Sequence, residues 1–194
     1  MPYSDEHQVI FLHVPKTGGT AIAELLRIRQ FSDPSSKTRP TPQHYTSAML
    51  RERLGEDTWT HYYSFTFVRN PWARLLSTYY WRQQLPKKRP MLPFGNFVEH
   101  AGTCVANRDY YDEDFGDHFI PQVEFADGVD EVFHFEAFAD SIRTVAERLA
   151  MAPPVVPPKS PKPQDDYRTY YDDRIRARVA EIYADDIAEF DYSF

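Results

Sequence analysis

The sequence predicts an α/β fold with a mostly parallel central sheet. Three segments of apolar and β-branched residues are expected strands, and helical patterns follow them along the chain. The first segment, "VIFLHV" at residues 9–14, is apolar almost throughout, as a strand buried on both faces of a parallel sheet would be. Strands that alternate with helices are typical of such a sheet, so we expect layers of helix and sheet.

The elements of the first part of the chain follow from local signals. A glycine turn after residue 14 leads into a helix whose apolar face would be formed by Ile22, Leu25 and Leu26. Residues 31–45 hold three prolines and many hydroxyl side chains, which predicts a surface loop. A short helix, "SAMLRERL" at residues 47–54, is expected to end near Gly55.

A second strand is expected at residues 62–68, "YYSFTFV", with a helix directly after it. Asn70 has a side chain suited to an N-cap, and Pro71 stands at the first helical position, where proline is favoured. These signals predict a helix from residue 71 to about residue 84.

The last third of the chain begins with a third expected strand at residues 129–135, "VDEVFHF". An amphipathic helix should follow, because apolar residues recur at helical spacing: Phe138, Ile142, Val145 and Leu149. Six of the sixteen prolines fall in residues 153–163, which predicts an extended connector. The C-terminal part is expected to be helical again until its last residues.

Length and composition limit the classes of function. The 194 residues suit one domain over residues 1–194, and a net charge of −7 is a poor match for a nucleic-acid backbone. Cys104 is the chain's one cysteine, so no intramolecular disulfide is expected. The polar residues 1–8 do not resemble a signal peptide, and no apolar run approaches the ~20 residues of a membrane span. We therefore expect a soluble cytoplasmic protein.

The turn "PKTGGT" at residues 15–20 has the composition of an anion-binding loop. A strand that feeds a glycine turn and a helix exposes backbone N–H groups where the helix dipole favours negative charge. Gly18 and Gly19 allow close approach of a ligand, Thr17 and Thr20 add hydroxyl groups, and Lys16 adds a positive charge. The alternative is an ordinary strand-to-helix turn with a surface lysine.

The order of residues in this turn differs from that of the ATP-binding loop G-x-x-x-x-G-K-[ST], because Lys16 precedes both glycines. A kinase would also need an acidic residue at a strand end to hold Mg²⁺. The nearest candidates, Asp130 and Glu131, lie at the start of their expected strand. An ATP-dependent kinase is therefore a weak alternative.

A second candidate anion site lies in "FVRNPWARLLSTYY", residues 67–80. Arg69 ends the second strand, and Ser77 lies roughly 9 Å of helical rise beyond the helix start. An arginine folded along this turn can share one anion with Ser77, and parallel neighbouring strands place their carboxyl ends at one sheet edge. The alternatives are a strand-end ion pair for Arg69 and a solvated helix serine for Ser77.

Together the two stretches resemble the sulfotransferases that use 3′-phosphoadenosine 5′-phosphosulfate (PAPS), in particular the carbohydrate sulfotransferase-like branch, sulfotransferase family 2. "PQVEF" at residues 121–125 and "FHFEAF" at residues 133–138 are weaker points of likeness, and the resemblance covers nearly the whole chain. It implies a P-loop-like three-layer fold with a central sheet flanked by helices. It also implies PAPS as donor and its desulfonated nucleotide, PAP, as product.

The resemblance assigns roles to individual residues. Lys16 would contact the oxygen that bridges phosphate and sulfate, and Arg69 with Ser77 would hold the 3′-phosphate. The 5′-phosphate would be held by backbone amides of Thr17, Gly18, Gly19 and Thr20. Because a positioned cation stabilises charge on the leaving oxygen, no metal is expected.

A hydroxyl acceptor also needs a general base. The family's histidine after the first helix corresponds to His44 in "PQHYTSAM", and histidine titrates near neutral pH. The alternative is a loop histidine, with Glu24 and Glu136 as other candidate bases. His13 and His134, within expected strands, are interpreted as packed core residues.

The chain departs from the family pattern in three places. Ala21 stands where many relatives carry a hydroxyl residue, so only its backbone N–H remains for the donor. Asp191 stands where relatives usually have glycine. The proline-rich segment replaces a region that helps to close over the nucleotide, and from that region only Ser160 and Tyr167 are carried over as nucleotide contacts.

The sequence is least informative about the acceptor. The resemblance favours a hydroxyl of a carbohydrate or glycolipid, with a small alcohol or phenol left open. Nothing predicts the oligomeric state. The main alternative to an enzyme is a non-catalytic module that binds PAPS or PAP, although the presence of both Lys16 and a candidate base argues against it.

Overall fold

The computed structural model describes residues 3–27, 41–84, 90–110, 115–152 and 166–194. These residues form two compact units. The first unit comprises Met1–Val68 and Glu124–Lys159, and the second comprises Arg69–Val123 and Ser160–Phe194.

The first unit is built on a four-stranded sheet with the order β1-β2-β3-β4. Its strands are β1 (Tyr3–Ser4), β2 (Val9–Leu12), β3 (Tyr63–Val68) and β4 (Glu131–His134). The pairs β2–β3 and β3–β4 are parallel, and β1 is an antiparallel edge strand that sequence reasoning missed. The expected mostly parallel sheet is therefore confirmed.

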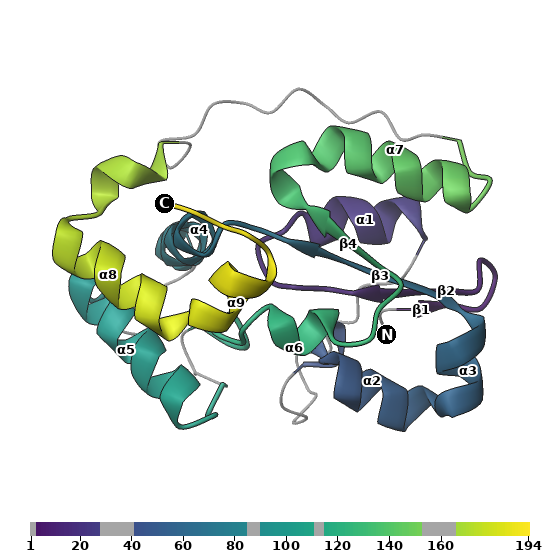
Figure 1. Cartoon of the computed structure of the whole chain (residues 1–194), viewed down its shortest axis with the longest axis horizontal. Coiled ribbons are helices and arrows are strands. Elements are labelled where there is room, and N and C mark those ends of the chain that lie inside the picture. Colours follow the sequence, from purple (N-terminus) through teal and green to yellow (C-terminus); the bar gives the residue numbers. More distant parts are fainter. Residues whose placement is uncertain (1–2, 28–40, 85–89, 111–114, 153–165) are drawn as a thin grey trace. The chain divides into compact units, whose positions relative to one another are not determined.

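Helices cover both sides of this sheet (Figure 1). The helices α1 (Gly19–Leu25) and α7 (Phe138–Arg148) lie on one side, and α2 (Ser47–Leu54) and α6 (Val123–Ala126) lie on the other. On the α1 and α7 side, a cluster of buried side chains joins strands and helices: Val9, Phe11, Ile22, Leu26, Phe65, Phe67, Ile142 and Val145. This mixed α/β arrangement is consistent with the expected three-layer fold.

The second unit is helical in its described residues. It contains α4 (Pro71–Gln84), α5 (Phe94–Ala106), α8 (Asp173–Ile182) and α9 (Ala184–Glu189). These helices share one apolar core, with Trp72, Leu76, Phe97, Ala101, Val179 and Tyr183 among its buried members.

For two helices, the local sequence signals predicted the bounds that the structure shows. α2 begins at Ser47 and ends before Gly55, and α4 runs from Pro71 to Gln84. The Asn70 Oδ1 accepts hydrogen bonds from the backbone N–H of Trp72, at 3.1 Å, and of Ala73, at 3.3 Å. The N-cap predicted for Asn70 is thus confirmed.

Other boundaries differ from the prediction. β2 ends at Leu12 because the Val14 N–H turns back to the Leu12 carbonyl at 3.2 Å, which takes the chain out of the strand ladder. The expected C-terminal helix is divided at Tyr183 into α8 and α9. Among the described residues, three α-helices were not predicted: α3 (Glu56–His61), α5 and α6. The expected proline-rich connector lies outside the described residues.

Candidate functional site

The glycine turn after β2 has an unusual backbone. Lys16 has a φ of 72°, and Gly18 has φ 85° and ψ 14°, so both are in the left-handed region. For a residue with a β-carbon this conformation costs about 1–2 kcal/mol. Such strain gathers at functional sites. A left-handed residue followed by the helical Gly19 is also the kind of pair that turns successive N–H groups toward one concave point.

Hydrogen bonds within the turn already engage two of its predicted ligand groups. The hydroxyl of Thr17, a fully buried residue, donates to the Val14 carbonyl at 2.8 Å, so it holds the turn together. The Ala21 N–H donates to the Gly18 carbonyl at 3.0 Å as part of the first turn of α1. Thr20 and Ala21 are exposed there. The predicted ligand contact of Thr17 therefore rests on its backbone N–H and not on its hydroxyl.

His13 packs against this turn. Its ring stacks on Phe11 at 5.5 Å between ring centroids, and it occupies the space next to Gly19 where a β-carbon would lie. The prediction of a packed strand histidine was wrong in part, because His13 follows the last residue of β2 and keeps some exposed surface. The position next to Gly19 makes it part of the site.

His44, the candidate base, also lies beside His13. It ends the 3₁₀ helix Pro42–His44, and its side chain is buried, with 5% of the residue exposed. The rings of His13 and His44 meet edge to face with 5.0 Å between centroids. The Nδ1 of His44 lies 3.3 Å from the Thr41 hydroxyl. The structure thus brings His44 to the histidine that packs against the turn.

The charge of Lys16 influences the protonation of His13. Burial lowers the pKa of His13 well below its ordinary value, and the nearby His44 and Lys16 lower that pKa further. At neutral pH His13 is therefore uncharged. Within the first unit, His13 and His44 thus adjoin each other at the carboxyl end of β2, and the charge of Lys16 acts on His13.

Aromatic side chains close on Gly18. A β-carbon at this position would lie 2.8 Å from the Phe138 Cε2 and 3.2 Å from the Phe135 Cε2. Phe135 belongs to the 3₁₀ helix Phe135–Ala137, and Phe138 begins α7. In the sequence, "FHFEAF" was only a weak point of likeness to the family. The structure shows that two of its rings leave no room for a β-carbon at residue 18, which explains the glycine there.

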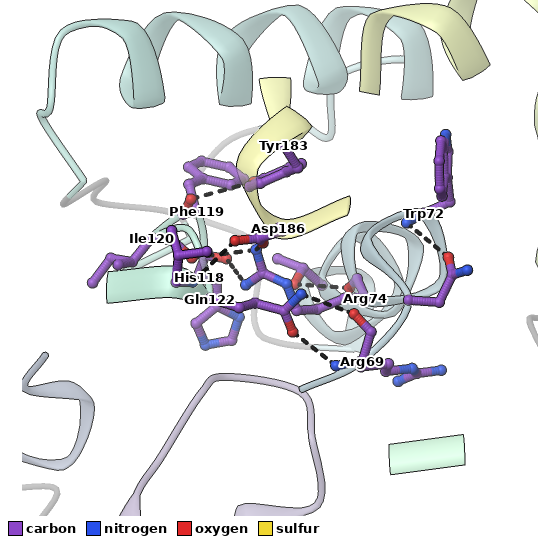
Figure 2. A network of polar contacts seen from close by, with 12 residues as sticks. Arg69, Trp72, Arg74, His118, Phe119, Ile120, Gln122, Tyr183 and Asp186 are labelled. Carbon is purple, nitrogen blue, oxygen red and sulfur yellow. Dashed lines mark hydrogen bonds and ion pairs between the residues drawn. The ribbon is translucent and has the colours of Figure 1, made fainter. Parts of the chain in front are cut away.

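The second predicted anion site lies in the second unit. Arg69 follows the last residue of β3 and is buried, with 9% of the residue exposed. Its backbone N–H donates to the Gln122 Oε1 at 2.8 Å, and the Gln122 Nε2 donates to its carbonyl at 2.9 Å (Figure 2). Ser77 is half-buried on α4.

A buried polar network supports this region (Figure 2). The guanidinium of Arg74, on α4, donates to the carbonyls of His118 and Ile120, each at 3.2 Å. It also lies 3.9 Å from the carboxylate of Asp186, on α9. Asp186 accepts from the Val123 N–H at 3.0 Å, and burial raises its pKa.

The remaining predicted residues lie in varied surroundings. Tyr167 is buried against the rings of Tyr171 and Phe194, and Ser160 lies outside the described residues. Glu24 and Glu136 are exposed. The core position expected for His134 was wrong, because this residue is exposed at the end of β4.

The described part of the chain contains neither a metal-binding group nor a membrane-spanning helix. No group of three or more His, Cys, Asp or Glu side chains there is arranged to hold a metal ion. Among the helices of the same residues, none combines the length and apolar character that crossing a membrane requires.

A glycine turn with its lysine, between a parallel strand and a helix, is an arrangement with which many α/β proteins hold an anionic group at the carboxyl edge of a sheet. The model of the sulfotransferase family matches residues 1–193, and the chain therefore belongs to that family. Membership implies a PAPS-type sulfate donor and a hydroxyl-bearing acceptor. Comparison with curated proteins and with solved structures gave no match.

Proposed function

We propose that the protein transfers a sulfuryl group from PAPS to a hydroxyl group of an acceptor, with residues 1–194 acting as one P-loop-like sulfotransferase domain. The observation that carries the proposal is the contact of His44, the candidate base, with His13, which packs against Gly19 of the turn that bears Lys16. His44 is far from this turn in sequence, and no local pattern required it to reach His13. The family match over residues 1–193 supports the same chemistry.

The residues of the turn fit a phosphosulfate. Gly18 and Gly19 carry no β-carbon where His13, Phe135 and Phe138 crowd the backbone, so the chain can form a tight concave turn. Backbone N–H groups from Thr17 to Thr20 and the Lys16 ammonium would hold the 5′ end of the donor, whereas the Ala21 N–H is engaged within α1. Arg69 and Ser77 would hold its 3′-phosphate, with Ser160 and Tyr167 as weaker assignments.

Each catalytic side chain has a defined task. PAPS supplies the activated sulfuryl group when it is bound. The Lys16 ammonium would neutralise the charge that develops on the leaving oxygen, so we expect no metal requirement. His44 would accept the proton of the attacking hydroxyl. Because His13 is uncharged at neutral pH, it does not oppose that protonation of its neighbour.

The acceptor is proposed to be a carbohydrate or glycolipid hydroxyl. The test is a screen of saccharides, glycolipids, small alcohols and phenols with ³⁵S-labelled PAPS, in the presence of a chelator. The expected result is label on a saccharide or glycolipid with full activity in chelator. Label on a phenol alone would contradict the acceptor class, and binding of PAP without transfer to any acceptor would favour a non-catalytic module.

A further inference from the structure

We propose that Gln122 is a positioning residue that sets the direction of Arg69 toward the 3′-phosphate of the donor. This proposal rests on the proposed function, because it presumes that Arg69 binds that phosphate. The residues that carry it, Arg69, Gln122, Asp186 and Arg74, all belong to the second unit.

The contact between Gln122 and Arg69 is a complete amide pair. The Gln122 Oε1 accepts from the Arg69 N–H at 2.8 Å, and the Gln122 Nε2 donates to the Arg69 carbonyl at 2.9 Å. A side chain must carry both a donor and an acceptor in one plane to make this pair, which among the uncharged residues limits it to glutamine and asparagine. Gln122 is fully buried, so water does not compete for either bond.

The amide pair lies directly after the end of β3, where the backbone no longer forms hydrogen bonds with neighbouring strands. β3 ends at Val68, and the next residue needs new partners for its N–H and carbonyl groups. Gln122 provides both. With the backbone of Arg69 held on both sides, its Cα–Cβ direction is set, and the side chain extends away from Gln122 (Figure 2).

Gln122 is held in turn by the buried network. The residue after Gln122, Val123, donates its backbone N–H to the Asp186 carboxylate at 3.0 Å. Asp186, on α9, also pairs with Arg74 of α4 at 3.9 Å. The buried contacts of α4 and α9 therefore anchor the backbone directly beside Gln122, whose side chain holds the backbone of Arg69.

A positioning role predicts an effect on the 3′-phosphate and not on the rest of the nucleotide. The experiment measures, by calorimetry, the affinities for PAP and for adenosine 5′-phosphate, which lacks the 3′-phosphate. The variants are Gln122→Met, which keeps the side-chain length but neither hydrogen bond, Arg69→Ala, and the double variant. We expect Gln122→Met to reduce the ratio of the two affinities roughly tenfold, or ~1.4 kcal/mol.

Two comparisons separate positioning from general stability. Tyr183→Phe removes another buried hydrogen bond of this unit, from the Tyr183 hydroxyl to the Phe119 carbonyl, and should leave the affinity ratio unchanged. In the Arg69→Ala background, Gln122→Met should cause no further loss of the ratio, because both changes act through one contact. Should Gln122→Met not fold, Gln122→Asn, which keeps the amide but shortens its reach, takes its place.

The outcomes are distinct. If the unchanged protein binds PAP no better than adenosine 5′-phosphate, the assignment of Arg69 in the proposed function is wrong. If it prefers PAP, and Arg69→Ala loses that preference while Gln122→Met keeps it, the positioning role is overturned. An equal loss of both affinities in Gln122→Met, or additive losses in the double variant, would overturn it as well.

Discussion

The imidazole of His13 occupies the space that a β-carbon on Gly19 would need. The contact joins the residue after β2 to the first residue of α1, so it holds the two ends of the glycine turn together. It also places His13 between the turn and His44. A residue that the sequence marks as an ordinary strand histidine is therefore a structural part of the site.

Replacing Gly19 with alanine should destabilise the protein. The added methyl group must displace the His13 ring, and overpacking of this kind costs about 1–3 kcal/mol. Urea unfolding measures the loss. Gly95→Ala is the matched control on α5, where the nearest side chain, Ile175, would lie at an ordinary 3.6 Å, and a small gain of about 0.5–1 kcal/mol is expected. If Gly19→Ala costs the same in a His13→Ala background, the contact with His13 is not the cause.

The stability should depend on pH through His13. Its pKa is lowered in the folded protein, whereas the unfolded chain takes up this proton near the ordinary value of 6.5. The stabilisation is thus present above about pH 6.5 and is lost as the pH falls through that value toward the folded pKa. Unfolding free energies measured between pH 7.5 and 5 should fall in the unchanged protein and fall less steeply in His13→Gln. Equal slopes would contradict the burial of a neutral His13.

His44→Gln should lower sulfuryl transfer by about 10²- to 10⁴-fold, the usual contribution of a general base, while PAP binding is kept. Transfer of ³⁵S label and calorimetry with PAP measure the two properties. The control is His61→Gln, since His61 is exposed on α3 and its Nδ1 lies 2.6 Å from the Asp57 carbonyl of the same helix. If His44→Gln kept full activity and Glu24→Gln or Glu136→Gln lost it, the general base would be that carboxylate and not His44.

Asp191→Gly should stabilise the second unit. Asp191 has a φ of 53°, and the Tyr192 N–H donates to the Ile187 carbonyl at 3.1 Å, so α9 ends in a Schellman motif with aspartate at the position that favours glycine. Relief of the left-handed strain should raise the free energy of unfolding by about 0.5–1 kcal/mol. Asp185→Gly, at an exposed position in the first turn of α9, should instead destabilise. A loss of stability in Asp191→Gly would show that the carboxylate has another role.

The parts of the fold that depend on neighbours in sequence were predictable. Asn70 and Pro71 located the start of α4, and Gly55 located the end of α2, because caps and breakers act within one helical turn. α5 was missed because it contains Gly95 and Gly102, which disfavour a helix. A β-carbon at Gly102 would lie 3.0 Å from the Cδ1 and 3.2 Å from the Cγ1 of Ile182, so close packing against α8 favours glycine there.

The same distinction applies to the site. The turn and its lysine were visible as a local pattern, although the buried hydrogen bond of the Thr17 hydroxyl was not. The contacts of His13 with His44, and of Gln122 with Arg69, join residues distant in sequence, the second pair 53 positions apart. No spacing rule relates such residues, so only the folded structure could reveal them.

The most direct test of the account compares single-turnover transfer from ³⁵S-labelled PAPS in the unchanged protein and in Lys16→Ala. This variant keeps a β-carbon, so the left-handed backbone at residue 16 is equally strained in both proteins. Arg143→Ala, which removes an exposed cation on α7, is the control. We predict that Lys16→Ala lowers the transfer rate by about 10²- to 10³-fold while Arg143→Ala leaves it unchanged. Transfer by Lys16→Ala at the rate of the unchanged protein would contradict the central role of Lys16.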